Sequence, residues 1–291
     1  RDGLKGSVFD DTDPGFASGK TGMEETLSRC FLGADAWCAS PAQTVNYASC
    51  HDNLTLFDHL QTARPQASRE ELVRMNNLAA AFYMMAEGVP FLQAGEEMLR
   101  TKVNDDGSFN SNSYNANDQV NCLKWGDLDD EAYQQVFEYY KGLIAFRRAH
   151  GALRLGTAQE VSEAVSVVDG LDANVIAFNI KGGVNGETAE EMYLIFNANE
   201  TSTTVRLPEG NWNVYINGEK AGTQPLASVS GGSAVVEPVS ALVLVKEDAA
   251  VTPDTQDGGA EENTGLAVGI AAAAVLACGG GVFAALRKKR K

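Results

Sequence analysis

Apolar residues recur at helical spacing within residues 68–87 of the chain. One face carries four of them, three or four positions apart: Met75, Leu78, Phe82 and Met85. Ser68 opens this segment and Glu71 follows three residues later, the spacing of a capping box that satisfies two backbone N–H groups. We therefore expect a helix over residues 68–87, with Gly88 placed to end it.

The same spacing returns in residues 129–149, before Gly151. Its apolar face consists of Val136, Tyr140, Leu143 and Phe146. Two short apolar runs flank the first helix, TVNYAS at residues 44–49 and VPFLQAG at residues 89–95, and both read as strands. Strand, helix, strand and helix in this order are typical of an α/β unit with a parallel sheet.

The pattern changes after residue 151. Short β-prone runs now alternate with polar turns; the runs are NVIAFNI, MYLIFNA, TTVRLP, WNVYIN and ALVLVK. Strands at this spacing predict an antiparallel β-sandwich over residues 152–247. The α/β part, residues 1–151, has too few strands to close a sheet. We expect it to be the C-terminal portion of a (β/α)8 catalytic barrel.

The last part of the chain reads as a membrane anchor. Residues 248–265 are acidic and lack periodicity, which predicts a linker. Residues 266–286 carry no charge, and about 20 apolar residues suffice for a helix to cross a bilayer. The basic run at 287–291 follows at once, and such residues stay on the cytoplasmic side. We expect a single transmembrane helix that holds the preceding residues on the extracellular face; a buried helix is the alternative.

This tail resembles the sorting signal of Gram-positive wall-anchored proteins, in which a Thr-Gly pair, an apolar span and a basic end follow one another. Thr264 and Gly265 stand at the corresponding place. The Leu-Pro that precedes this pair in the family is replaced by Glu261 and Glu262. A plain membrane anchor is therefore expected, rather than covalent attachment by a sortase.

The net charge of the chain excludes some classes of binding partner. The net charge is −16, with 39 acidic against 23 basic residues, and the last five positions hold five of the basic ones. Such a chain repels nucleic acid, whereas a neutral polymer such as a glucan is indifferent to it. The five cysteines are scattered without metal-ligand spacing, which favours free thiols. We expect no metal site or cofactor, and leave calcium open.

His51 and Asp52 follow the predicted strand at 44–49. In parallel α/β folds catalytic groups lie at the carboxyl ends of strands, which makes this pair a candidate site. The alternative is structural, because Asp52 could instead cap a helix over residues 53–60. Two acidic residues and one basic residue, Glu96, Glu97 and Arg100, stand after the second predicted strand. They could form a structural patch of ion pairs.

Four segments in order carry a resemblance to a known family. They are RDGLKGSVFD at residues 1–10, the His51–Asp52 pair, GVPFLQAGEE at residues 88–97 and SYNANDQVN at residues 113–121. Together they resemble the α-amylase superfamily of glycoside hydrolases, and more narrowly the pullulanase-type debranching enzymes. In that family one strand ends in His-Asp, and the next carries a Gly-x-Pro-x-x-x-x-Gly-x-Glu pattern, which Gly88 to Glu97 match.

The resemblance implies roles for six residues. Asp52 matches the carboxylate that stabilises the transition state, and His51 matches the histidine that hydrogen-bonds the sugar. Four substrate-binding residues match a loop over the glucan cleft: Tyr114, Asn115, Asp118 and Asn121. The alternative for this loop is a solvated, Asn-rich turn. Three aromatic residues could stack on glucose rings or belong to the core: Tyr47, Tyr114 and Trp125.

The function that the resemblance implies is hydrolysis of α-1,6-glucosidic bonds in pullulan, amylopectin or limit dextrins, with retention. Retention needs a nucleophile and an acid/base carboxyl about 5 Å apart. In the superfamily both come from strands before the His-Asp strand, and the 50 residues before His51 carry neither motif. We expect both groups to lie outside this chain, and the chain alone to be inactive. The alternatives are a non-catalytic surface glucan-binding protein, or another hydrolase or branching enzyme of the superfamily.

Overall fold

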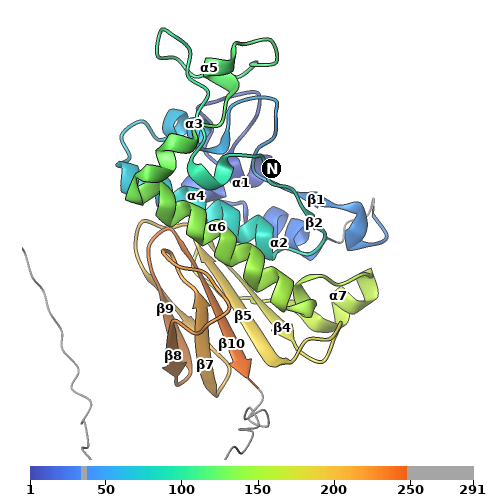
Figure 1. Ribbon diagram of the computed structural model, residues 1–291. Coiled ribbons are helices and arrows are strands. Elements are labelled where there is room, and N and C mark those ends of the chain that lie inside the picture. Colours follow the sequence, from blue (N-terminus) through green and yellow to red (C-terminus); the bar gives the residue numbers. More distant parts are fainter. Residues whose placement is uncertain (34–37, 248–291) are drawn as a thin grey trace, which may run out of the picture. The chain divides into compact units, whose positions relative to one another are not determined.

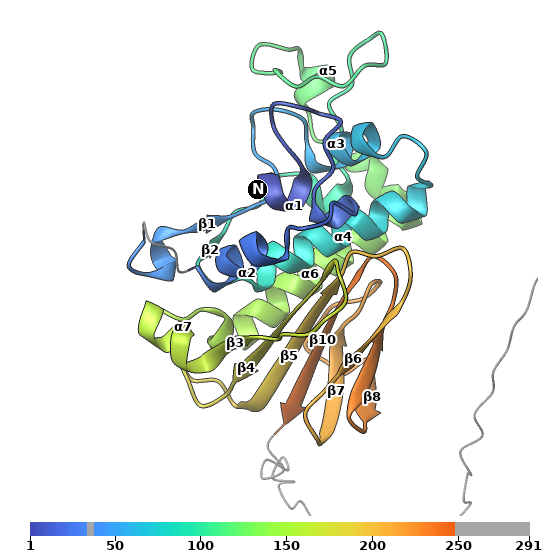
Figure 2. The ribbon, with the colours of Figure 1, turned by 180° about the vertical axis from the view of Figure 1, so that it is seen from behind.

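A layer of helices with one short pair of parallel strands packs against an antiparallel β-sheet (Figures 1 and 2). The computed structural model describes residues 1–33 and 38–247. Seven α-helices lie within these ranges: α1 (Asp2–Lys5), α2 (Glu24–Leu32), α3 (Leu56–Ala63), α4 (Arg69–Met85), α5 (Asp118–Asn121), α6 (Glu131–Ala149) and α7 (Ala158–Ala164).

Helix α4 confirms the capping box predicted from the sequence. The Ser68 Oγ accepts a hydrogen bond from the Glu71 N–H at 3.2 Å, and the Glu71 Oε2 accepts one from the Ser68 N–H at 2.7 Å. The helix ends at Met85, earlier than Gly88. Gly88 instead has φ +95, and a Cβ there would lie 2.2 Å from the Thr44 Oγ1. Gly88 is therefore needed for the tight turn that follows the helix, and it is not the residue that ends the helix.

Helix α6 runs beside α4 in the same direction. It begins at Glu131, two residues later than predicted, because the Asp130 Oδ1 accepts from the Ala132 N–H at 2.8 Å and caps it. Near its other end, the buried Arg147 guanidinium donates to the carbonyl oxygens of Met84, Ala86 and Gly88, each at 2.8 Å. These carbonyls lie at and just beyond the end of α4, where no helical N–H reaches them.

The two predicted parallel strands are confirmed as a pair but are short. Strand β1 (Val45–Asn46) pairs with β2 (Val89–Pro90), with Val45 opposite Val89. Helices α3 and α4 connect them, which is the expected strand–helix–strand order. The described residues contain this one parallel pair and no closed barrel. The barrel therefore stays a prediction.

The β part is confirmed as antiparallel. Its six-stranded sheet has the order β3 (Val165–Val167), β4 (Val175–Lys181), β5 (Ala189–Asn197), β10 (Ser240–Glu247), β7 (Asn211–Ile216) and β8 (Ala227–Ser230). A second, two-stranded sheet pairs β6 (Thr203–Arg206) with β9 (Ser233–Val236). The five apolar runs form β4, β5, β6, β7 and β10. Helix α7 and strands β3, β8 and β9 were not predicted, since each is short and partly exposed.

Both faces of the large sheet are covered. On the helix side, the Phe31 ring of α2 stacks on Phe178 of β4 with ring centroids 3.7 Å apart, and Phe82 of α4 meets Phe196 of β5 at 4.9 Å. On the other side, Trp212 packs in a separate apolar cluster with residues of β6 and β9. The core thus crosses the predicted boundary at residue 151, and the described residues 1–33 and 38–247 lie within one compact unit.

The predicted anchor lies outside the described residues. Within residues 1–33 and 38–247, no helix is long and apolar enough to span a membrane. The linker at 248–265, the span at 266–286 and the basic tail stay predictions.

Cys30, Cys50 and Cys122 are free thiols, as expected.

Glu87 is a buried carboxyl where α4, β2 and the β part meet. Its side chain is fully buried, and its Oε2 accepts from the Leu155 N–H at 2.9 Å. Among the described residues, its Oε1 has no hydrogen-bond partner. Burial raises the pKa of Glu87 from 4.5 to about 7, although the Leu155 N–H and the charge of Arg147 act in the opposite direction.

The contact between helices and sheet predicts a large effect of truncating Phe178. Phe178→Ala should lower the free energy of unfolding by about 3–5 kcal/mol, since it removes a fully buried ring that stacks on Phe31. Val235→Ala, at a side chain that is 59% exposed, should change it by less than about 0.5 kcal/mol. Urea denaturation measures both. Equal effects would mean that the two layers do not share a core.

The raised pKa of Glu87 predicts a pH-dependent stability. The folded chain holds this proton more tightly than the unfolded chain, so the contribution of Glu87 to the stability is fully present below about pH 4.5 and is lost as the pH rises through 7. Glu87→Gln removes this dependence. The difference in unfolding free energy between variant and wild type should change by about 3 kcal/mol between pH 4.5 and 7.5. Parallel stability curves would contradict the assignment.

Candidate functional site

His51 and Asp52 lie on the loop between β1 and α3, and both project into solvent. Their side chains are 88% and 68% exposed, and the His51 Nε2 lies 3.5 Å from the Asp52 Oδ2. The next residue, Asn53, has φ +64, so the main chain turns sharply after the pair. The pair thus lies on the loop that follows the parallel strand β1, separated by four residues from the last residue of that strand, Asn46.

The helix-cap interpretation of Asp52 is wrong. Helix α3 begins at Leu56, and its cap is Thr55, whose Oγ1 accepts from the Asp58 N–H at 3.1 Å. The Asp52 carboxylate is therefore not needed to start this helix. The sequence did not reveal this because Asp and Thr are both good caps and lie three residues apart.

Two buried lysines hold the main chain of this loop. The Lys102 Nζ donates to the His51 carbonyl at 3.0 Å, and the Lys5 Nζ donates to the Leu54 carbonyl at 3.0 Å. Burial lowers the pKa of both lysines. The Lys102 N–H in turn donates to the buried Asp58 Oδ2 at 2.9 Å. Burial raises the pKa of Asp58.

The predicted ion-pair patch after β2 is wrong. Glu96 is buried and accepts from three hydroxyl groups, which belong to Ser49, Tyr83 and Tyr140. Arg100 donates to main-chain carbonyls, at Ala94 and Asn121, rather than to Glu96. The acidic residue turns inward because it follows a glycine with φ +94, a bend that the pattern of charges does not reveal.

The loop that carries the other predicted site residues rises at the same end of the helix layer as the β1–α3 loop (Figures 1 and 2). Tyr114, Asn115 and Asp118 are exposed, Tyr114 to 83%. Asn121 differs, because its Nδ2 donates to the carbonyl oxygens of Ser113 at 2.7 Å and Ala116 at 3.3 Å. Its amide therefore holds the loop, while the other three face solvent.

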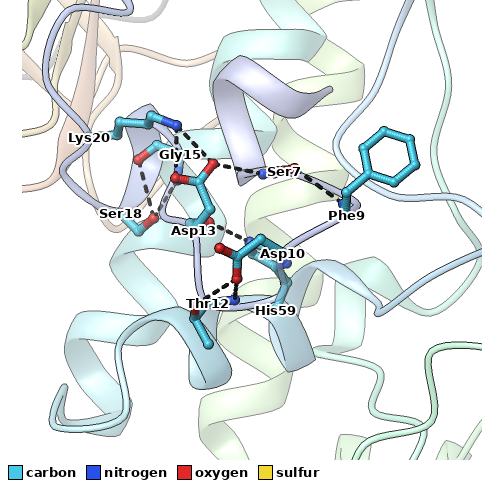
Figure 3. Close-up of polar contacts among 9 residues, drawn as sticks. All are labelled: Ser7, Phe9, Asp10, Thr12, Asp13, Gly15, Ser18, Lys20 and His59. Carbon is cyan, nitrogen blue, oxygen red and sulfur yellow. Dashed lines mark hydrogen bonds and ion pairs between the residues drawn. The ribbon is translucent and has the colours of Figure 1, made fainter.

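The N-terminal loop presents an aromatic side chain that the sequence did not single out. Phe9 is 95% exposed, and its ring points away from the polar cluster behind it (Figure 3). In that cluster Asp13 accepts from Lys20 at 2.8 Å, which lowers the pKa of the carboxyl, and the Asp13 carbonyl lies 3.0 Å from the buried His59 Nε2. The exposure depends on this loop geometry, which no periodicity encodes.

Two further features bear on ligands. Within the described ranges, no group of three or more His, Cys, Asp or Glu residues is arranged to hold a metal ion. A groove of about 1010 Å³ lies where the first turns of α4 and α6 meet the β7–β8 connection. None of the six predicted site residues lines this groove.

Comparison with known proteins agrees with this architecture. The family model "Pullulanase, all-beta domain" matches residues 161–220. The pullulanase of Bacillus subtilis (strain 168) is 30% identical over 214 residues, which are 72% of this chain and 29% of that protein. Residues 161–220 cover strands β3, β4, β5, β6 and β7, so the family model and the antiparallel sheet coincide.

Solved structures match over a larger share of the chain. The pullulanase from Bacillus acidopullulyticus has a TM-score of 0.79 at 34% identity, over 84% of this chain and 29% of its own. The pullulanase from Paenibacillus barengoltzii, in complex with maltohexaose and α-cyclodextrin, has a TM-score of 0.75 at 32% identity, over 85% of this chain and 38% of its own.

The chain therefore has the fold and sequence of a section of a glycoside hydrolase. More narrowly, that section is of the pullulanase type, as the four sequence segments indicated. The chain spans less than a third of the Bacillus subtilis relative.

The two hydrogen bonds of Asn121 predict that its amide keeps the 113–121 loop closed. Asn121→Ala should raise the rate of chymotrypsin cleavage after Tyr114 about fivefold, because roughly 1 kcal/mol of local stabilisation is lost. Gln119→Ala, at an exposed amide in the same loop, is the control and should leave the rate unchanged. Equal cleavage rates in both variants and the wild type would refute the structural role of Asn121.

Proposed function

We propose that this chain is part of an enzyme that hydrolyses α-1,6-glucosidic bonds in α-glucans with retention of configuration. The supporting observation is the exposed His51–Asp52 pair on the loop that follows the carboxyl end of a parallel strand, in a chain of the pullulanase type. Catalytic groups of parallel α/β folds lie at this end of their strands.

Asp52 has the role of a transition-state stabiliser in this proposal. The transition state of glycoside hydrolysis resembles an oxocarbenium ion, so a fixed carboxylate beside the sugar ring lowers its energy. The carboxylate oxygens also accept hydrogen bonds from sugar hydroxyls. His51, 3.5 Å away, can donate to the same sugar from its Nε2. The nucleophile and the acid/base carboxyl are proposed to lie outside these 291 residues, so the chain alone should not turn over substrate.

The substrate is proposed to be a neutral glucan such as pullulan, amylopectin or a limit dextrin. The Paenibacillus barengoltzii pullulanase binds maltohexaose, and the net charge of −16 places no penalty on a neutral polymer. The exposed rings of Phe9, Tyr114 and Trp125 can stack on glucose. Tyr47 is better explained as structural, since it packs edge-on against Phe91 with centroids 5.8 Å apart.

The loop at 113–121 is proposed to cover part of the glucan cleft. Asn115 and Asp118 are exposed and can hydrogen-bond sugar hydroxyls, while Asn121 fixes the loop conformation. The enzyme is further proposed to act on the extracellular face of a membrane, held by the apolar residues 266–286.

The role of Asp52 is tested by substitution in the complete enzyme. Asp52→Asn keeps the shape and removes the charge, so the release of reducing ends from pullulan should fall by a factor of about 10² to 10³ or more. Binding of maltotetraose should be largely retained. Asp169→Asn, at an exposed carboxyl on the β part, is the matched control and should be fully active.

Two other outcomes would redirect the proposal. Full activity of Asp52→Asn would refute the assignment of the transition-state carboxylate. Glucan binding by the wild-type enzyme without any release of reducing ends would favour a surface glucan-binding protein instead.

A further inference from the structure

Glu96 is a buried carboxyl that joins three separate segments of the chain. Its Oε2 accepts from the Ser49 Oγ at 2.5 Å, and its Oε1 accepts from the Tyr83 OH at 2.7 Å and the Tyr140 OH at 3.1 Å. Ser49 lies three residues after β1, Tyr83 lies on α4 and Tyr140 lies on α6. All four side chains are almost fully buried.

Of these three hydrogen bonds, the one from Ser49 connects Glu96 to the loop of the proposed site. Ser49 stands two residues before His51, and its hydroxyl is held from below by the carboxylate of Glu96. Beyond the pair, Lys102 holds the His51 carbonyl and Lys5 holds the Leu54 carbonyl. The exposed His51 and Asp52 therefore sit on a main chain that is fixed at three points by buried, ionisable side chains.

We infer that Glu96 is a positioning residue: through Ser49, its carboxyl fixes the main chain that presents His51 and Asp52. This inference rests on the proposed function, and names the group that supports the proposed site from beneath. A buried carboxylate is costly unless its lone pairs are satisfied, and three hydroxyl donors satisfy this one. A hydrogen bond to an ionised carboxylate is stronger than one between two neutral groups, so it holds the main chain near Ser49 more firmly.

The charge of Glu96 makes this support sensitive to pH. Burial raises the pKa of Glu96 from 4.5 to about 6, against the effect of the three hydroxyl donors and with a smaller contribution from Glu97. The other titratable groups that face it are Tyr83 on α4, Tyr140 on α6 and Lys5 on α1. Above pH 6 the carboxylate accepts all three bonds. Below pH 6 it gains a proton, and one hydroxyl must stop donating.

The first test uses the 291-residue chain and does not depend on catalysis. The amide resonances of residues 50–53 are recorded by ¹⁵N NMR at pH 7.5. Glu96→Ala and Ser49→Ala should shift or broaden these signals, whereas Ser49→Thr, which keeps the hydroxyl, should restore them. Glu138→Gln, at an exposed carboxyl on α6, is the matched control. If Glu96→Ala does not fold, Ser49→Ala still removes the single contact in question.

A pH titration separates positioning from simple packing. In a His51→Gln background, which removes the titration of the imidazole, the amides of Ser49 and Cys50 should show an inflection near pH 6. The inflection should be absent when Glu96→Gln is added. Amides that do not titrate, or that titrate equally with glutamine at position 96, would overturn the inference.

The complete enzyme supplies the functional test. Ser49→Ala should lower kcat on pullulan about tenfold or more, with KM changed by less than about twofold, because misplaced catalytic groups mainly affect the transition state. Shifted amides in an enzyme with no activity on pullulan would refute the proposed function and leave the positioning role intact. Unshifted amides in an active enzyme would refute the positioning role and leave the function intact.

Discussion

Helix α4 is buried on nearly every side, and the rest of the structure depends on how its polar groups are satisfied. Twelve of its 17 residues are buried, and the helix packs against the β-sheet and helices α2, α3 and α6. A buried polar group on such a helix costs free energy unless it is hydrogen-bonded, and several of those on α4 have partners on neighbouring elements. The Asn76 amide donates to the Tyr140 hydroxyl, and the Tyr83 hydroxyl donates to Glu96. The carbonyls at its end accept from Arg147.

These pairings connect the interior to the surface. Glu96 accepts hydrogen bonds from hydroxyl groups on both α4 and α6. It also accepts one from Ser49, which connects these helices to the loop of His51 and Asp52. Just beyond Tyr83, at the same end of α4, Arg147 and Glu87 join the helix to the segment that leads into the β part. One buried helix thus determines both the position of the proposed site and the attachment of the β-sheet. The sheet shares its core with the helices, so its stability and theirs are linked.

Patterns that depend on local periodicity were predicted correctly from the sequence. The α4 capping box follows from the spacing of Ser68 and Glu71, and helix α6 and the strands β4, β5, β6, β7 and β10 follow from the pattern of apolar residues. Strands β3, β8 and β9 were missed because each has only three or four residues and is partly exposed. The inward turn of Glu96 and the exposure of Phe9 were missed for another reason. Both depend on how the main chain bends, at Gly95 before Glu96 and in the loop that carries Phe9, and the pattern of apolar and charged residues does not record these bends.

The proposed site shows the same division. His51 and Asp52 were located by their place after a strand, and Thr55 rather than Asp52 proves to cap α3. Of the four residues predicted on the 113–121 loop, three are exposed, whereas Asn121 holds the loop. Sequence resemblance identifies the residues of a loop as a group, but only the hydrogen bonds of each side chain separate those free to meet a ligand from those that shape the loop.

The most direct test of this account is the location of a bound glucan in the complete enzyme, by a crystal structure with maltotetraose. The account predicts a glucose ring with hydroxyls within hydrogen-bond distance of the Asp52 carboxylate and the His51 Nε2. A glucan bound in the groove between α4, α6 and the β7–β8 connection, with His51 and Asp52 left in solvent, would contradict it.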